Sequence, residues 1–198
     1  MPLVRHAVPA SPGAGLPQRG PGRLTDRRTS LTTTARRLKD HLRDNLYPPN
    51  LVHSTATAFE SEDEDATIFV QVATQWNTWP SGEFRSFANS TRTHEGSAHE
   101  RGFRGALSDI VNDYARRQRH LCAEDEDITT EAIYEGLTAV VSVKLAHPVF
   151  EGADRTKLSN PEADTYVHEV VREHLTHWFD HHPNEAATII HRILSAST

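Results

Sequence analysis

Between residues 52 and 89 the pattern of hydrophobic and polar positions is typical of β-strands. Residues 52–59 and 67–75 are short stretches rich in β-branched side chains, and the second alternates aliphatic with other side chains. The acidic run between them, residues 60–65, is predicted to be a hairpin connection. A Pro-Ser-Gly turn at residues 80–82 then leads into a predicted third strand over residues 83–89.

Other segments follow the helical spacing of i, i+3, i+4 and i+7, which buries one stripe of a helix. The predicted helices, in chain order, are residues 32–45, 97–119, 130–134 with Thr129 or Thr130 as the cap, 167–179 and 186–194. Between the third and fourth lies a nearly unbroken apolar run, residues 137–145. It is too short and too β-branched for a buried helix, so it is predicted to be a strand covered along most of its length.

The predicted strands cluster early and the predicted helices late, and the two do not alternate regularly. This order favours the α+β class over a doubly wound α/β fold. A chain of 198 residues has room for one domain of ordinary size and a tail. We therefore expect one α+β domain over residues 37–198.

Charge is distributed unevenly along the chain. Residues 1–37 carry seven arginines and one acid, Asp26, whereas the whole chain has a net charge of −6, so the remainder carries −12. Residues 1–36 are also rich in proline and glycine, and they bury too little apolar surface to offset the entropy of ordering. We predict a disordered basic tail, with an arginine arm that grips DNA as the alternative.

Several classes of protein are excluded by what the sequence lacks. No stretch approaches the roughly 18 apolar residues of a membrane-spanning helix, and the N-terminus has no apolar core of a secretory signal, so we expect no membrane contact and a cytoplasmic protein. The single cysteine, Cys122, cannot form an intramolecular disulfide or a Cys-rich zinc site. No Gly-x-Ser-x-Gly elbow is present, and we expect no catalytic nucleophile.

A cluster of histidines near the C-terminus raises the question of a metal site. His174, His177 and His181 have the spacing to share one helix face, and His182 follows them. Three imidazoles would form an open zinc site. The neighbouring His168-Glu169 pair lacks the second histidine of a zincin motif, so the expected metal ligands are none and a histidine metal site is the remote alternative.

Six separate blocks of sequence resemble the transducer domain of DNA gyrase B, part of a type IIA DNA topoisomerase. They occur in register between Lys39 and Leu194, and they are residues 72–77 (Val-Ala-Thr-Gln-Trp-Asn), 86–96 (beginning Ser-Phe-Ala-Asn), 99–104 (His-Glu-Arg-Gly-Phe-Arg), 135–144 (beginning Glu-Gly-Leu-Thr-Ala), 150–152 (Phe-Glu-Gly) and 175–179 (Leu-Thr-His-Trp-Phe). The likeness covers some four-fifths of the chain.

The resemblance implies a mostly antiparallel transducer-type sheet with helices on one face and a left-handed βαβ crossover, contrary to the usual hand. It also implies a function, the coupling of ATP binding to DNA strand passage within an isomerase. Neither the Asp-x-Gly-x-Gly motif of the ATPase domain nor the carboxylates of a Toprim module occur in the sequence. We therefore expect a truncated paralogue or fragment that is inactive alone.

ATP and Mg²⁺ are expected only in the context of a complete gyrase, with gyrase subunits or an ATPase domain acting in trans as partners. The alternative is an interaction module that binds gyrase and regulates it. DNA is expected to bind weakly and non-specifically, if at all. Arg101 and Arg104, which lie off the apolar stripe of the long predicted helix, are the candidate phosphate contacts.

In this family the loop after the long strand reads Glu-Gly-Gln-Thr-Lys, and its glutamine and lysine contact the γ-phosphate. Here the resemblance puts Ala153 at the glutamine, Asp154 at the threonine and Arg155 at the lysine. Arg155 can still bind phosphate in a bidentate manner, although its planar fork differs from a compact ammonium. Because Ala153 removes a donor and Asp154 adds a like charge, we expect either a weakened sensor or a structural loop.

Two further departures from the family pattern lie just before blocks that carry the resemblance. Ser97 stands where the family has the second of two glycines at the entrance to the long helix, so a permissive residue is expected to be lost there. Tyr134 occupies the place of an arginine before the Glu-Gly-Leu sequence.

Overall fold

The computed structural model describes residues 51–53, 56–63, 65, 67–78, 80, 82–94 and 96–196. The predicted tail at 1–36 and the predicted helix at 32–45 lie outside these ranges. Within the described part, no helix is both long enough and apolar enough to cross a membrane.

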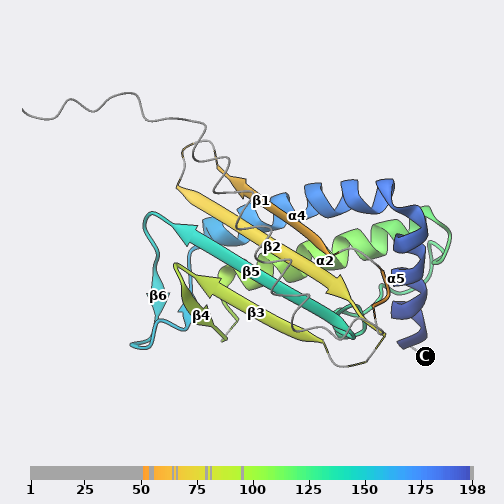
Figure 1. Ribbon diagram of the computed structural model, residues 1–198, viewed down its shortest axis with the longest axis horizontal. Coiled ribbons are helices and arrows are strands. Elements are labelled where there is room, and N and C mark those ends of the chain that lie inside the picture. The colour runs from red at the N-terminus through yellow and green to blue at the C-terminus, as the bar shows by residue number, and fades with distance from the viewer. Residues whose placement is uncertain are drawn as a thin grey trace, which may run out of the picture.

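A five-stranded mixed sheet forms one layer of the molecule (Figure 1). Its strands are β1 (Thr57–Glu62), β2 (Ile68–Trp76), β3 (Glu83–Ala88), β4 (Thr91–Thr93) and β5 (Leu137–Leu145). The spatial order is β1-β2-β5-β3-β4, and only β3 and β5 run parallel. Strand β5 thus has a paired strand on each side, and only Lys144 among its nine residues is exposed. It lacks a polar face because both of its faces are covered, with Val141 in the main core and Val140 packed with Ala73 in a second, smaller cluster.

The first hairpin differs from its prediction. The first strand was expected over residues 52–59, but β1 begins at Thr57 and extends to Glu62, so half of the predicted acidic connection is strand. An edge strand tolerates these charges, and Glu60 accepts a hydrogen bond of 3.2 Å from Gln71 on β2. Asp63 closes the turn, because its carboxylate accepts from the Ile68 backbone N–H at 2.7 Å.

Strand β4 was not predicted and follows β3 through a two-residue turn. Asn89 and Ser90 have φ angles of 47° and 70°, the left-handed region that a type I′ hairpin turn requires at both central positions. Asn89 then holds the end of β5, accepting from Leu145 N at 2.7 Å and donating to its carbonyl oxygen at 2.9 Å. The Asn-Ser pair therefore forms the turn, and Asn89 also links it to the end of β5.

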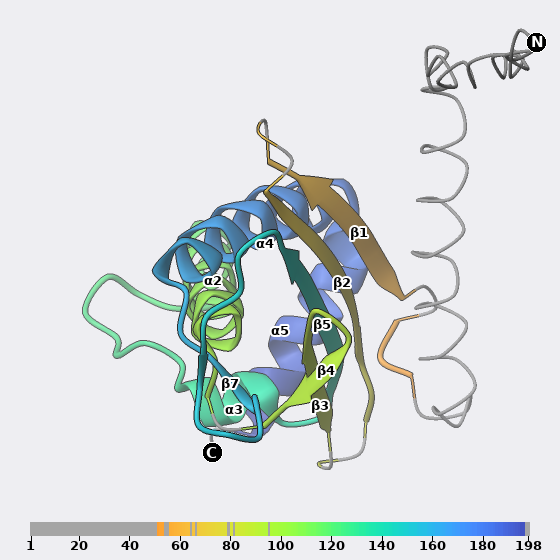
Figure 2. The ribbon, with the colours of Figure 1, turned by 90° about the vertical axis from the view of Figure 1, so that its left-hand side faces the viewer.

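The helices pack on one face of the sheet (Figure 2). They are α2 (Ala98–Arg117), α3 (Thr130–Tyr134), α4 (Pro161–His181) and α5 (Pro183–Ala196). The apolar stripes predicted for α2, α4 and α5 are buried, and Thr129 caps α3 by accepting from the Ala132 N–H. Helix α2 ends two residues before the predicted Arg119, whose φ of 61° is not helical. The mixed sheet with helices on one face confirms the predicted combination of sheet and helices.

The core lies between this sheet face and the helices. Trp76, Phe103 and Phe179 are its largest fully buried side chains. The Phe179 ring meets the Tyr114 ring at 5.2 Å and the Trp76 ring at 6.5 Å, both edge to face. Aromatic side chains from β2, α2 and α4 thus meet at one point of the core.

Candidate functional site

The loop that follows β5 is a small hairpin, which the periodicity did not predict. Its strands are β6 (Phe150–Glu151) and β7 (Lys157–Leu158), which pair antiparallel. Of the residues between them, 152–156, the first four are exposed, and both Gly152 (φ 78°) and Arg155 (φ 53°) adopt left-handed backbone conformations. Ala153, Asp154 and Arg155, the residues that the sequence singled out, therefore all lie at the solvent-facing tip of one short hairpin.

The base of the hairpin is fixed by hydrogen bonds from three directions. Leu158 N donates to the Ser97 hydroxyl at 2.9 Å, and His94 N donates to the Thr156 carbonyl oxygen at 3.3 Å. Asn160, immediately before α4, accepts from Val149 N at 2.6 Å. The exposed tip is thus mounted on a base that contacts the starts of α2 and α4.

Ser97 has a different role from the one expected of it. Its backbone φ of −61° lies in the ordinary extended region, so no glycine is required at this position. Its side chain is buried and does not cap α2. The hydroxyl instead satisfies the buried N–H of Leu158. The expectation of a lost permissive residue is therefore wrong, and Ser97 adds a hydrogen bond between α2 and the hairpin.

Replacing Ser97 by glycine is expected to loosen the hairpin base. The Leu158 N–H would lose its partner in a buried position, which costs about 1–3 kcal/mol. We expect the Leu158 amide hydrogen to exchange faster with solvent while α2 keeps its protection. Ser159→Ala is the matched control, because the Ser159 hydroxyl makes only an exposed bond to the Val149 carbonyl oxygen. Equal exchange at Leu158 in Ser97→Gly and the unmodified chain would contradict this role.

At the tip of the hairpin, Arg155 is the positive charge that an anion could meet. Lys157 is engaged by Glu151, with 2.6 Å between Nζ and Oε2. Ala153 has no side-chain donor, and Asp154 places a carboxylate beside Arg155 in the sequence. A phosphate group therefore fits this tip only through the Arg155 guanidinium, which can donate two parallel hydrogen bonds.

The two arginines predicted as nucleic-acid contacts both lie on the exposed side of α2, but each has a partner. Arg101 pairs with Asp164 on α4, with 3.2 Å between Nε and Oδ2. Arg104 lies over the Tyr134 ring at 4.4 Å and the Phe84 ring at 5.2 Å. Tyr134, which the resemblance places at an arginine of the family, thus supplies a π-face to an arginine from α2. Burial raises the pKa of the Tyr134 phenol, and its hydroxyl has no hydrogen-bond partner among the described residues.

A buried polar cluster at the start of α2 was missed by sequence reasoning. The Ser86 hydroxyl on β3 donates to Glu100 Oε1 at 2.6 Å and lies 2.5 Å from the Thr93 hydroxyl. Thr93 in turn lies 3.4 Å from His99 Nε2. Burial of the ring lowers the pKa of His99 to about 4, opposed in part by the Glu100 carboxylate. His99 is therefore neutral at pH 7.

The C-terminal histidines do not converge on one point. His174 stacks on Phe59 at 4.5 Å, and His182 stacks on Trp178 at 4.8 Å. The ring centroids of His177 and His181 lie 3.9 Å apart, and Nδ1 of His181 is hydrogen-bonded to the His177 carbonyl oxygen. No group of three His, Cys, Asp or Glu side chains in the described ranges is arranged to hold a metal ion.

A family model and the similar sequences both relate this chain to DNA gyrase B. The sequence model of the family described as DNA gyrase B matches residues 37–198. The chain is 49% identical over 149 residues to the novobiocin-sensitive DNA gyrase B protein of Streptomyces niveus and 50% identical over 147 residues to the DNA gyrase B protein of Streptomyces coelicolor. These matches cover 75% and 74% of this chain but 22% and 21% of the relatives, so the chain spans about a fifth of their length.

A solved structure shares the fold. It is the 43K ATPase domain of Thermus thermophilus gyrase B in complex with an aminocoumarin, which superposes with a TM-score of 0.71 at 29% sequence identity. The match covers 80% of this chain and 42% of that chain.

Proposed function

Because the chain belongs to the DNA gyrase B family, we propose that it is the transducer part of such an enzyme, coupling ATP binding to DNA strand passage without catalytic activity of its own. The observation that carries this proposal is the hairpin after β5. Its exposed tip bears Arg155, and its base is hydrogen-bonded to Ser97 at the start of α2. A contact at the tip can therefore be transmitted to a 20-residue helix.

The sense of the β3–β5 connection supports the proposal. In Figure 1 both strands point to the left, and β5 lies above β3. Helix α2, which follows β3 and precedes β5 in the chain, lies behind the sheet. Figure 2 places the helices on the same single side. The connection is therefore left-handed, a sense that only about 2% of such crossovers adopt and that the transducer resemblance implies.

ATP and Mg²⁺ would be held by the ATPase domain of a complete gyrase, with this chain contributing only at the terminal phosphate. Arg155 would donate to phosphate oxygens, while Asp154 repels the same charge. Ala153 has no side-chain donor, so it cannot make the phosphate contact that the glutamine makes in the family. The proposed loop therefore responds to the terminal phosphate less strongly than the family loop does.

The partners that follow from this role are the other gyrase subunits and DNA, in the cytoplasm. Arg101 and Arg104 remain the proposed DNA contacts, although Asp164 and the rings of Phe84 and Tyr134 compete for them. Such contacts to phosphates carry no sequence specificity and weaken with salt.

A graft tests the proposal directly. The matching segment of the Streptomyces coelicolor gyrase B protein would be replaced by this chain's sequence, and ATP-dependent supercoiling would be measured with the cognate partner protein. We expect a folded graft with reduced supercoiling. Activity should rise in the variant Ala153→Gln/Asp154→Thr/Arg155→Lys, which restores the family loop. A folded graft that is inactive with either loop would refute the transducer role.

The alternative role, a module that binds gyrase and regulates it, predicts a different result. The free chain would then lower supercoiling when added to the intact enzyme. A graft that supports supercoiling, together with a free chain that leaves the intact enzyme unaffected, favours the transducer role.

A further inference from the structure

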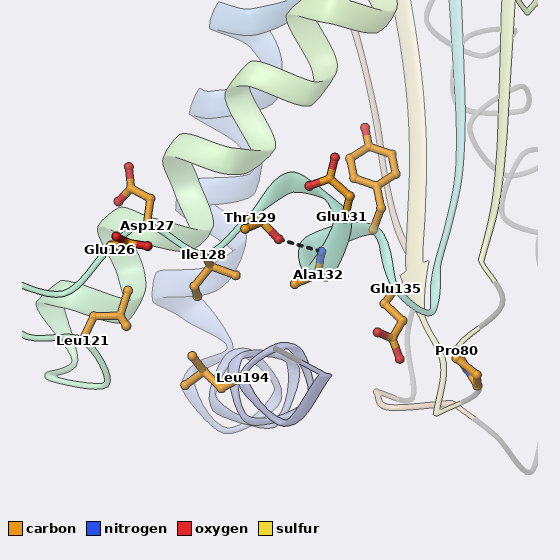
Figure 3. Close-up of a pocket in the computed structure, with 11 residues that line it drawn as sticks. Pro80, Leu121, Glu126, Asp127, Ile128, Thr129, Glu131, Ala132, Glu135 and Leu194 are labelled. Atoms are coloured by element: carbon orange, nitrogen blue, oxygen red, sulfur yellow. Dashed lines mark hydrogen bonds between the residues drawn. The ribbon is translucent and has the colours of Figure 1, made fainter. Parts of the chain in front are cut away.

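An open groove lies beside α3 and α5 (Figure 3), and Figure 1 shows α5 at the opposite end of the molecule from β6. Its volume is about 820 Å³, and the arm after α2, helix α3 and helix α5 form its walls. Leu121, Ile128 and Leu194 turn toward one another across its centre (Figure 3). The groove thus has an apolar floor that a side chain of moderate size can enter.

The rim of this groove is acidic. Glu126, Asp127, Glu131 and Glu135 all line it. Two of them are paired, since Asp127 contacts Arg116 and Glu135 contacts Arg192 at 3.1 Å. Glu126 and Glu131 are exposed and have no ion-pair partner in the described part of the chain. The groove therefore suits an occupant that brings an apolar side chain flanked by positive charges.

One segment of this chain has the apolar and positively charged side chains that the groove suits. Residues 19–37 carry six of the seven arginines of the basic segment, and Leu24 stands between Arg23 and the pair Arg27 and Arg28. The gyrase B family match begins at residue 37, so almost all of this segment lies outside it. The charges of segment and groove are complementary, and arginine can bind a carboxylate with two parallel hydrogen bonds.

The point at which the described chain begins lies beside the groove. Leu51 forms a bridge with Asn77, and Asn77 N donates to the Gly136 carbonyl oxygen at 2.9 Å. Gly136 N in turn donates to the carbonyl oxygen of Pro80, which lines the groove together with Glu135. Only the 13 residues 38–50 separate this point from the arginine-rich segment, and such a length of chain can span at most about 45 Å.

We propose that residues 19–37 of this chain bind the groove formed by Leu121, Ile128 and Leu194, with their arginines on Glu126 and Glu131. A short tether gives an effective concentration in the millimolar range, so weak charge contacts suffice to hold the segment. Binding of this kind covers the apolar floor of the groove. It also keeps the arginines from acting as a free DNA-binding arm.

Cys122 provides a natural probe for this contact. It is the single cysteine of the chain, it is exposed, and it follows Leu121 of the groove. A nitroxide attached to Cys122 in the full chain is expected to broaden the amide resonances of residues 19–37 at low salt. The broadening should be lost in the double variant Glu126→Gln/Glu131→Gln, and it should weaken as salt screens the charges.

Matched variants and a competitor distinguish the possible outcomes. Glu169→Gln/Glu173→Gln makes the same change in charge on α4, away from the groove, and should leave the broadening unchanged. An added peptide of residues 19–37 should restore the sharp signals. Broadening that is absent at low salt, that survives the Glu126→Gln/Glu131→Gln change, or that appears only at high protein concentration would overturn binding within one chain.

Discussion

Replacing Gly102 by alanine is expected to destabilise the fold by about 2 kcal/mol. An alanine Cβ at this position would lie 2.2 Å from the carbonyl oxygen of Asp164 and 3.0 Å from its carbonyl carbon. Both are backbone atoms of α4, so α2 and α4 would have to move apart. Overpacking of this kind costs about 1–3 kcal/mol and occasionally more, against a gain of up to about 1 kcal/mol from the better helix propensity of alanine.

Gly105 is the matched control on the same helix. A Cβ there would meet only the side chain of His168, 3.3 Å away at Cδ2. A side chain can give way where a backbone carbonyl cannot, so Gly105→Ala should be neutral or stabilising by up to about 1 kcal/mol. Urea unfolding of the two variants measures the difference. Equal stability of both would show that the α2–α4 contact is looser than the structure has it.

Gly102 also shows what the sequence could and could not reveal. It stands in the block His99–Arg104 that carries part of the family resemblance, but no spacing rule says why a glycine is needed inside a helix. The reason is the close approach of Asp164 on α4, far away in the chain. Periodicity predicts that α2 forms and which stripe it buries, whereas the partner of that stripe depends on the tertiary fold.

Element length sets a similar limit on the predicted sheet. Strand β5 is nine residues long and its apolar run identifies it, whereas β4, β6 and β7 have two or three residues and no measurable period. Backbone turns and single hydrogen bonds define these short strands. The Asn89-Ser90 pair is a sequence signal of the β3–β4 turn, since asparagine tolerates the left-handed region.

In the candidate site, too, the sequence revealed one part, the tip of the hairpin, and not the other, the hydrogen bonds of its base. The family resemblance located Ala153, Asp154 and Arg155, and the structure brings them to one exposed tip. The base beneath them could not be predicted, because its hydrogen bonds join positions far apart in the chain. Ser97 is the clearest example: as a departure from a glycine pattern it indicated a loss, yet its hydroxyl binds a backbone N–H 61 residues away.

The buried ring of His99 is expected to make the protein sensitive to acid. Burial lowers its pKa from 6.5 to about 4 in the folded state, with the Glu100 carboxylate opposing the shift. The unfolded chain therefore binds more protons between these two values, and the free energy of unfolding falls as the pH drops from about 6.5 toward 4. This contribution is fully present above pH 6.5, and its total loss amounts to about 3 kcal/mol.

The measurement is the free energy of unfolding at several pH values for the unmodified chain and for His99→Gln, which cannot titrate in this range. From pH 7 to pH 4, the free energy of unfolding of the unmodified chain should fall by about 3 kcal/mol relative to that of His99→Gln. His181→Gln, at an exposed position on α4, serves as the control, because it removes an imidazole that is not buried. Parallel curves for the unmodified chain and His99→Gln would mean that the His99 ring accepts a proton in the folded state as readily as in the unfolded one. The hydrogen-bonded cluster of Ser86, Thr93 and Glu100 would then have to accommodate a charged imidazole, whose Nδ1 has no hydrogen-bond partner among the described residues.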